Sequence, residues 1–272
     1  MSRRLIAVAA LALAASALTA CSGSTAPEES GSSSSDSGSD FGLVKDGTLT
    51  VATEGTYRPF SFHEDNGTGD LTGYDVEIIQ AVGDKLGLTV EFQETQWDAI
   101  FAGLDAGRFD VIANQVTIND EREENYLFSA PYTVSPGVII VAEDDDSITS
   151  FDDLAGKTAA QSLTSNWNDL AVESGATVEA VEGWAQAVAL LRQGRVDATI
   201  NDKLTFLDYE KTDGPTGLKI AAETDDAGEQ AFTFTKDKQA LVDAVDGALE
   251  ELRADGTLAE ISTKYFGEDV SE

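Results

Sequence analysis

The sequence predicts an α/β protein of two similar lobes, each a mixed, mainly parallel sheet flanked by helices. The first observation is an internal repeat: residues 97–114 read WDAIFAGLDAGRFDVIAN and residues 184–201 read WAQAVALLRQGRVDATIN. A tryptophan, a Gly-Arg pair, an aspartate and a final asparagine recur at the same spacing. Such self-similarity is typical of a structural unit that occurs twice in the chain. Two copies therefore predict two lobes.

Within each copy the apolar pattern changes from helical spacing to a short continuous run. Apolar residues fall three or four positions apart before Gly107 and before Gly194, and each glycine is placed to end a helix. Mostly apolar runs follow at Phe109–Ala113 and Val196–Ile200. Such runs are typical of strands that helices cover on both faces. Each repeat thus predicts a helix followed by a buried strand.

The rest of the chain supplies further strands and helices in alternation. Leu49 and Val51 alternate with polar residues, apolar residues from Val76 to Leu86 line one helix face, and Leu88–Phe92 alternate again. The second lobe offers strands near Lys157–Ala160 and Val178–Val181. This alternation of strand and helix is the third observation behind the predicted α/β class.

The last part of the chain has no place in a completed second lobe. It predicts a strand at Ala231–Thr235 and an amphipathic helix from about Gln239 to Ala254. We assign it to the first lobe. Lobe 1 then comprises residues 41–134 and 231–272, and lobe 2 comprises residues 135–230.

This assignment requires the chain to cross between the lobes twice. The extended stretches near Tyr132–Gly137 and Ala227–Ala231 are the candidates. Two such crossings form a hinge, so we expect a cleft that can close on a ligand. In open α/β sheets, ligands lie beyond the carboxyl ends of the strands. That rule points to Asn114-Gln115 and Asn201-Asp202, which follow the two repeated strands.

The N-terminus predicts export and a lipid anchor. Arg3 and Arg4 precede an apolar run, Leu5–Ala17, that is too short to span a bilayer, so residues 1–20 are interpreted as a signal peptide. The small residues before Cys21 suit cleavage at a lipid-modified cysteine. The alternative is a secretory signal with an incidental cysteine, but Cys21 is the only cysteine in the chain.

Residues 21–40 are dominated by serine, glycine and acid, a composition typical of a flexible tether. We therefore expect the protein on the extracytoplasmic face of the cell membrane, attached through Cys21.

Charge and composition exclude several classes of function. The chain has a formal net charge of −33, and loss of Arg3 and Arg4 leaves 15 basic residues against 50 acidic ones, or −35. A surface of that charge is not expected to bind nucleic acid. The single histidine, His63, and the absence of clustered ligands in the sequence argue against a transition-metal site, and no cofactor is expected.

Several motifs resemble those of the family 3 solute-binding proteins of ABC importers. They are the helix-opening Gly73-Tyr74-Asp75, the run Asn114-Gln115-Val116-Thr117-Ile118, Asp120-Glu121-Arg122, and Phe128-Ser129-Ala130-Pro131-Tyr132. The resemblance extends from about Thr48 to Gly267. It implies a type II periplasmic-binding-protein fold, a small amino-acid ligand, and delivery to the transmembrane permease subunits of an ABC transporter. We expect the protein to be a monomer.

A free amino acid needs one cation and one anion when water is excluded from it. Arg122 can hold the carboxylate with two parallel hydrogen bonds, and Thr117 can donate a third. Asp202 can accept from the ammonium group. The alternatives are a surface ion pair of Arg122 with Asp120 or Glu121, and a helix-capping role for Asp202.

Other residues would complete the pocket. Ser165 precedes a helical stretch and is a second carboxylate donor, with a plain helix cap as the alternative. The resemblance places Tyr57 and Trp97 in the pocket wall, and Phe60 there or, by preference, in the core. Trp184 is expected to be structural.

Within the family, the resemblance is strongest to the cystine-binding subgroup. It includes the run Thr53-Glu54-Gly55-Thr56-Tyr57, which adds Glu54 to the expected site. Arg58 departs from the expected small residue or proline, and a second cation there would favour an acidic amino acid instead. No nucleophile and base motif occurs, so a binding protein is expected rather than an enzyme of the prephenate or arogenate dehydratase type on the same scaffold.

Overall fold

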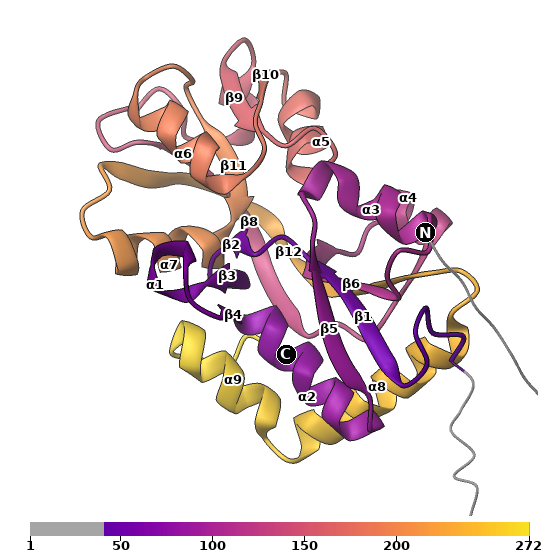
Figure 1. Ribbon diagram of the computed structural model, residues 1–272. Coiled ribbons are helices and arrows are strands. Elements are labelled where there is room, and N and C mark those ends of the chain that lie inside the picture. The colour runs from indigo at the N-terminus through magenta and orange to yellow at the C-terminus, as the bar shows by residue number, and fades with distance from the viewer. Residues whose placement is uncertain (1–40, 272) are drawn as a thin grey trace, which may run out of the picture. The chain divides into compact units, whose positions relative to one another are not determined.

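The structure is a computed structural model that describes residues 41–271 (Figure 1). The predicted signal peptide, Cys21 and the tether fall outside these residues.

A mixed sheet runs through the described residues in the strand order β11-β8-β12-β6-β1-β5, with β7 beside β12. β1 is parallel to both β5 and β6, whereas β12 is antiparallel to β6, β7 and β8. Its strands are β1 (Thr48–Thr53), β5 (Thr89–Glu94), β6 (Val111–Thr117), β7 (Tyr126–Phe128), β8 (Thr133–Ala142), β11 (Thr199–Asp202) and β12 (Leu218–Thr235).

Two smaller sheets complete the strands of the described part. One is antiparallel and consists of β2 (Thr56–Tyr57), β3 (Ser61–His63) and β4 (Leu71–Thr72). The other is the parallel pair β9 (Thr158–Gln161) and β10 (Thr177–Ala180), and β9 also meets the chain just before β11 at Ala198. Figure 1 places β9 and β10 with β11 at one end of the body and β1 with β5 at the other.

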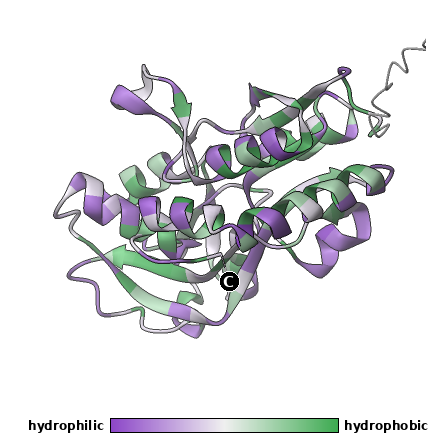
Figure 2. Cartoon of the chain, turned by 90° about the horizontal axis from the view of Figure 1, so that it is seen from below, coloured by the Kyte–Doolittle hydropathy of each residue, from purple (hydrophilic) through white to green (hydrophobic). Residues whose placement is uncertain are grey.

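Helices flank these sheets, as the α/β prediction requires. Figure 2 shows green along the strands and alternating green and purple along the helices, the pattern of helices with one buried face. They are α1 (Glu64–Gly67), α2 (Tyr74–Leu86), α3 (Trp97–Asp105), α4 (Asp120–Asn125), α5 (Asn166–Glu173), α6 (Trp184–Arg192), α7 (Lys203–Asp213), α8 (Gln239–Ala254) and α9 (Thr257–Phe266), with a 3₁₀ turn at Phe151–Leu154. The predicted α/β fold with mixed sheets flanked by helices is confirmed.

The C-terminal helices pack on the N-terminal part of the chain. α8 and α9 both contact α2, and Leu241, Val245 and Leu249 of α8 are fully buried in one core cluster with Ile78 and Val82 of α2. The strand predicted at Ala231–Thr235 is the end of β12, which begins much earlier, at Leu218.

β8 and β12 form a long antiparallel pair. The stretches predicted as crossings lie in it, with Thr133 opposite Gln230 and Pro136 opposite Ala227. The sequence predicted two extended crossings but not that they pair with each other. The division into lobes at residues 134 and 230 stays a prediction.

The glycine of the Gly73-Tyr74-Asp75 motif has a steric reason. Gly73 has φ of +134°, and a Cβ atom there would lie 2.2 Å from the carbonyl oxygen of Phe60. Only glycine fits such a close approach of two backbone segments. Gly73 therefore sets the start of α2 against the segment that carries Phe60.

Two predicted strand starts are wrong by two or three residues. β6 begins at Val111 rather than Phe109, and β11 begins at Thr199 rather than Val196. The repeated aspartates explain the difference. The N–H of Asp110 donates to the carbonyl of Thr50 at 2.8 Å, and the N–H of Asp197 donates to the carbonyl of Thr158 at 2.8 Å, before regular pairing starts.

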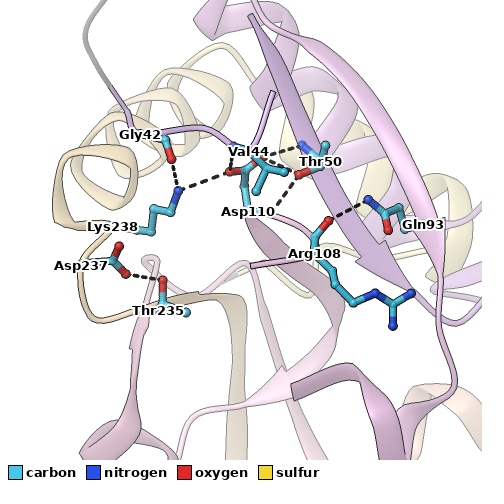
Figure 3. Close-up of polar contacts among 9 residues, drawn as sticks. All are labelled: Gly42, Val44, Thr50, Gln93, Arg108, Asp110, Thr235, Asp237 and Lys238. Carbon is cyan, nitrogen blue, oxygen red and sulfur yellow. Dashed lines mark hydrogen bonds and ion pairs between the residues drawn. The ribbon is translucent and has the colours of Figure 1, made fainter. Parts of the chain in front are cut away.

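The two aspartates also bond through their side chains to those same neighbours. Asp110 Oδ2 accepts from the N–H of Thr50 at 3.0 Å, and Asp197 Oδ2 accepts from the N–H of Thr158 at 2.7 Å. Asp110 further accepts from Val44 at 2.8 Å and pairs with Lys238 at 3.4 Å (Figure 3). The repeated Gly-Arg-x-Asp thus ties each repeat to the start of an adjacent strand.

We expect Asp110→Ala to lower the free energy of unfolding by about 3 kcal/mol, because it leaves buried N–H and hydroxyl donors without their acceptor. Denaturant titration measures the change. Asp84→Ala, at an exposed position of α2, is the control and should change stability by less than about 0.5 kcal/mol. Equal stability of the two variants would contradict the role given to Asp110.

Candidate functional site

A cavity of about 370 Å³ lies where the ends of β1 and β6 meet the segments around α5 and α6. Of the predicted site residues, six line it: Glu54, Tyr57, Trp97, Asn114, Gln115 and Ser165. Arg122, Asp202, Thr117 and Phe60 are not among its lining residues. The structure therefore brings most of the expected site to one place. Arg122 and Asp202, the two charged residues expected to pair with the ligand, lie outside the cavity lining.

Glu54 and Asn114 form one wall because β1 and β6 are parallel neighbours, so their carboxyl ends lie side by side. Asn114 Nδ2 donates to Glu54 Oε2 at 2.7 Å, and the N–H of Glu54 donates to Asn114 Oδ1 at 2.8 Å. Burial raises the pKa of Glu54 to about 7. The wall thus holds a carboxyl group that changes charge near neutral pH.

Gln115 turns away from regular strand geometry at the same edge. Its φ is +50°, which is uncommon for a residue other than glycine. Its N–H and its side-chain amide donate to the two carboxyl oxygens of Asp75 at 2.6 and 2.8 Å. Asp75 is fully buried, and burial raises its pKa to about 7. Strained backbone of this kind is concentrated at functional sites.

Tyr57 joins two segments that are far apart in the sequence. Its hydroxyl donates to Asn201 Oδ1 at 2.8 Å and accepts from Thr205 Oγ1 at 3.1 Å. Burial holds the pKa of Tyr57 well above its usual range. The neutral hydroxyl therefore bridges β2 to the β11–α7 junction beside the cavity.

Arg122 is a buried cation without an ion pair among residues 41–271. Its side chain donates to the carbonyl of Thr117 at 2.9 Å, and its guanidinium lies 5.5 Å from the ring centre of Trp97 and 5.4 Å from that of Phe101. Burial lowers its pKa to about 10. The alternative pairing with Asp120 or Glu121 is not formed in the described part. Arg122 therefore keeps hydrogen-bond donors available, and it lies beside Trp97, which lines the cavity.

Asp202 caps α7 and keeps one free oxygen. Its Oδ1 accepts from the N–H of Leu204 at 2.8 Å and from Ser135 Oγ at 2.7 Å. Its Oδ2 is buried and has no hydrogen-bond partner within residues 41–271. Burial raises its pKa to about 6. The capping role and an available carboxylate oxygen are thus both present.

For Ser165 and Phe60 the sequence left two roles open, and the structure shows where each residue lies. Ser165 is the N-cap of α5: its Oγ accepts from the N–H of Asn168 at 3.1 Å, and it also lines the cavity. Phe60 is fully buried in the core, with its ring centre 5.1 Å from that of Tyr57. Core packing is therefore the role the structure gives to Phe60.

Several wall residues were missed or assigned otherwise. Trp184, expected to be structural, lines the cavity, and so do residues of two loops near it, which include Gln161, Trp167, Glu182 and Gln186. The repeat could have indicated Trp184, since Trp97 at the matching position is also a wall residue. No sequence pattern indicated the loop residues.

The walls hold unsatisfied polar atoms. Trp97 Nε1, Gln115 Oε1 and Gln161 Nε2 are buried without a hydrogen-bond partner among the described residues. Buried polar groups are nearly always hydrogen-bonded, so groups left unpaired around a cavity indicate a polar ligand. Within residues 41–271, no three or more His, Cys, Asp or Glu side chains are grouped to hold a metal ion. No helix in that range is both long and apolar enough to cross a membrane.

Three buried acids give the body a pH dependence with a defined sign. Burial raises the folded-state pKa values of Glu54, Asp75 and Asp202 to about 6 or 7, above those of the unfolded chain. Their contribution to the free energy of unfolding is full below the pKa values of the unfolded chain, and it is lost as the pH rises through the pKa values of the folded protein.

We therefore expect the denaturant midpoint to rise as the pH falls from about 8 to about 5. Glu54→Gln should flatten this rise, because it removes one of the three groups, whereas Glu64→Gln at an exposed site should not. A midpoint that stays constant or falls over this range would contradict the assignment.

Fold and cavity together define a small-molecule binding protein, whose pocket lies beyond the carboxyl ends of strands and combines apolar walls with several polar side chains. The chain belongs to family 3 of the bacterial extracellular solute-binding proteins, which it matches over residues 49–268.

Among its relatives is the L-cystine-binding protein TcyA of Bacillus subtilis (strain 168), 55% identical over 230 residues that cover 85% of each chain.

Two solved structures show how the arrangement compares. The chain is 36% identical to an ancestral arginine-binding protein bound to arginine, with 81% of this chain and 99% of that one covered and a TM-score of 0.76. It is 45% identical to the L-cystine solute receptor of Neisseria gonorrhoeae in the unliganded open conformation, with 83% and 95% covered and a TM-score of 0.56. The higher identity goes with the lower structural similarity. The arrangement described here is therefore nearer to that of the arginine-bound protein.

Proposed function

We propose that this protein captures an L-amino acid outside the cytoplasm and delivers it to the permease subunits of an ABC importer, with cystine as the ligand. The observation that carries the proposal is the cavity whose walls hold buried polar atoms without a hydrogen-bond partner among the described residues. Near it lie a guanidinium without an ion pair and a carboxylate oxygen without a hydrogen-bond partner, both within residues 41–271. An amino acid supplies the complementary carboxylate and ammonium groups. The choice of cystine rests on the similarity to TcyA.

In this proposal Arg122 and Thr117 bind the carboxylate, Asp202 binds the ammonium group, and Ser165 donates a further hydrogen bond. Glu54, Asn114 and Gln115 contact the rest of the ligand, and Tyr57 and Trp97 form the wall. Because Arg122 and Asp202 do not line the cavity, a ligand must displace the side chains between it and them. An amino acid that pairs both charges would compensate for their desolvation.

Ligand capture would close two lobes, residues 41–134 with 231–272 and residues 135–230, about the β8–β12 pair. Contacts between the proposed lobes support this reading. Besides the bond from Tyr57 to Asn201, the hydroxyl of Thr164 donates to Asp98 at 2.8 Å. A ligand that bridges the lobes would favour the closed arrangement.

The proposal includes export, attachment to the membrane by a lipid on Cys21, and action as a monomer without catalysis. Metabolic labelling with a fatty acid tests the anchor, since Cys21→Ser should abolish incorporation. The acidic-ligand alternative suggested by Arg58 loses support, because Arg58 already pairs with Asp208 at 3.4 Å.

Calorimetry with cystine, cysteine, glutamate, glutamine and arginine tests the function. We expect tight one-to-one binding of cystine and weaker binding of the others. If none of the five binds, the proposal is wrong. Turnover of prephenate by the purified protein would replace it with the enzymatic alternative.

A further inference from the structure

A second cavity of about 290 Å³ adjoins the first. The two cavities share Thr56, Trp184 and Ala185 as wall residues, so these three residues lie at the boundary between them. The remaining walls come from Arg58 and from the facing helices α6 and α7. The site proposed above uses none of these other residues.

The second cavity holds a cation without an ion pair among the described residues. Arg192 reaches it from the last turn of α6, where a guanidinium nitrogen donates to the hydroxyl of Tyr209 at 3.2 Å. A single neutral partner leaves most of the guanidinium donors available. Arg58 differs, because its Nε pairs with Asp208 and its guanidinium lies 3.8 Å from the ring centre of Phe62.

Two carboxylates lie on the same wall. Asp208 is largely buried, with 9% of its side chain exposed, and burial raises its pKa. Asp213, five residues further along α7, also lines the cavity and forms no ion pair within residues 41–271. An aromatic pair completes the wall, since the rings of Trp184 and Tyr209 meet edge to face at 5.7 Å.

The second cavity thus repeats the chemistry of the first. The first is lined by Trp97 and Tyr57, with Arg122 and Asp202 close by but outside its lining, and the second is lined by Arg192, Asp208, Trp184 and Tyr209. A guanidinium next to a carboxylate is complementary to a carboxylate next to an ammonium group. The second cavity therefore suits a second α-amino-acid group.

We propose that the second cavity binds the distal α-amino-acid group of a ligand that carries two such groups on a short linker, as a disulfide-linked amino-acid dimer does. Arg192 binds the distal carboxylate, and Asp208 and Asp213 bind the distal ammonium group. The linker passes the shared wall of Thr56, Trp184 and Ala185. This inference rests on the proposed function, because it requires the proximal group to occupy the first cavity.

The test compares a ligand with two amino-acid groups with a ligand that has one. Cystine and S-methylcysteine are titrated calorimetrically into the wild type, Arg192→Gln and the control Arg195→Gln. Arg195 is also exposed and lies three residues further along, but it does not line the second cavity. We expect Arg192→Gln to weaken cystine binding about 10-fold or more and S-methylcysteine binding less than about twofold. Arg195→Gln should change neither.

Each other outcome is decisive. Retained binding of S-methylcysteine shows that Arg192→Gln is folded, so unchanged cystine binding in that variant overturns the inference alone. Equal losses for both ligands also overturn it, because Arg192 would then act on the first cavity. If the wild type binds S-methylcysteine but not cystine, the second group has no subsite. If it binds neither, the choice of cystine in the proposed function fails, and the inference with it; the other four amino acids then decide whether the proposed function stands.

Discussion

Replacing Arg122 with glutamine should weaken amino-acid binding about 100-fold or more. The change removes the guanidinium proposed to pair with the ligand carboxylate, and losing one partner of a desolvated charge pair costs about 3 kcal/mol. Calorimetry with cystine measures the loss. Glutamine keeps an uncharged polar side chain beside Trp97 and Phe101, whose ring centres lie 5.5 and 5.4 Å from the guanidinium.

The same variant should keep or gain stability in the absence of ligand. A buried cation that forms no ion pair costs desolvation free energy, and its removal offsets the lost bond to the Thr117 carbonyl. A denaturant midpoint at or above that of the wild type, together with weakened binding, is the expected pair of results. Weakened binding with a much lower midpoint would indicate a structural role for Arg122 instead.

Replacing Asp202 with asparagine should also weaken amino-acid binding about 100-fold, because it removes the negative charge proposed to hold the ligand ammonium group. Asparagine is an equally good N-cap, so the bond from the N–H of Leu204 and the stability of α7 should persist. Asp202→Ala is the contrasting variant. It should lose both binding and about 1 kcal/mol of stability.

The pH dependence of binding gives this prediction a second readout. Burial raises the pKa of Asp202 to about 6, so the free protein should lose affinity as the pH falls below that value. Calorimetry between pH 5 and pH 8 would show the loss in the wild type and a flatter profile in Asp202→Asn. Normal affinity in that variant at pH 7 would place the ammonium site elsewhere.

Much of the fold could be predicted because the relevant patterns are local. The apolar faces of α2 and α8 and the alternation in β1 and β5 follow from residue spacing within each segment. The strand starts at Val111 and Thr199 could not be placed, because they depend on the bonds of Asp110 and Asp197 to neighbouring strands. The length of β12 likewise depends on its pairing with β8.

The candidate site divides in the same way. Strand ends and motifs indicated Glu54, Asn114 and Gln115, which line the cavity, since parallel neighbours bring their carboxyl ends together. The sequence also indicated Arg122 and Asp202 but not their surroundings. Arg122 lies beside Trp97, and Asp202 accepts a hydrogen bond from Ser135. Each of these neighbours is distant in sequence from the charged residue that it contacts.

The main alternation of strands and helices, the repeat and the resemblance to the solute-binding family could be predicted, because each depends on residue types at fixed spacing. The walls of both cavities could not be predicted in this way, since they follow from tertiary packing. Trp184 and Arg192 become candidates because α6 and α7 both line the second cavity, which shares wall residues with the first. Side chains from segments more than a hundred residues apart meet there, as Tyr57 meets Asn201, and such contacts depend on long-range packing that local spacing does not encode.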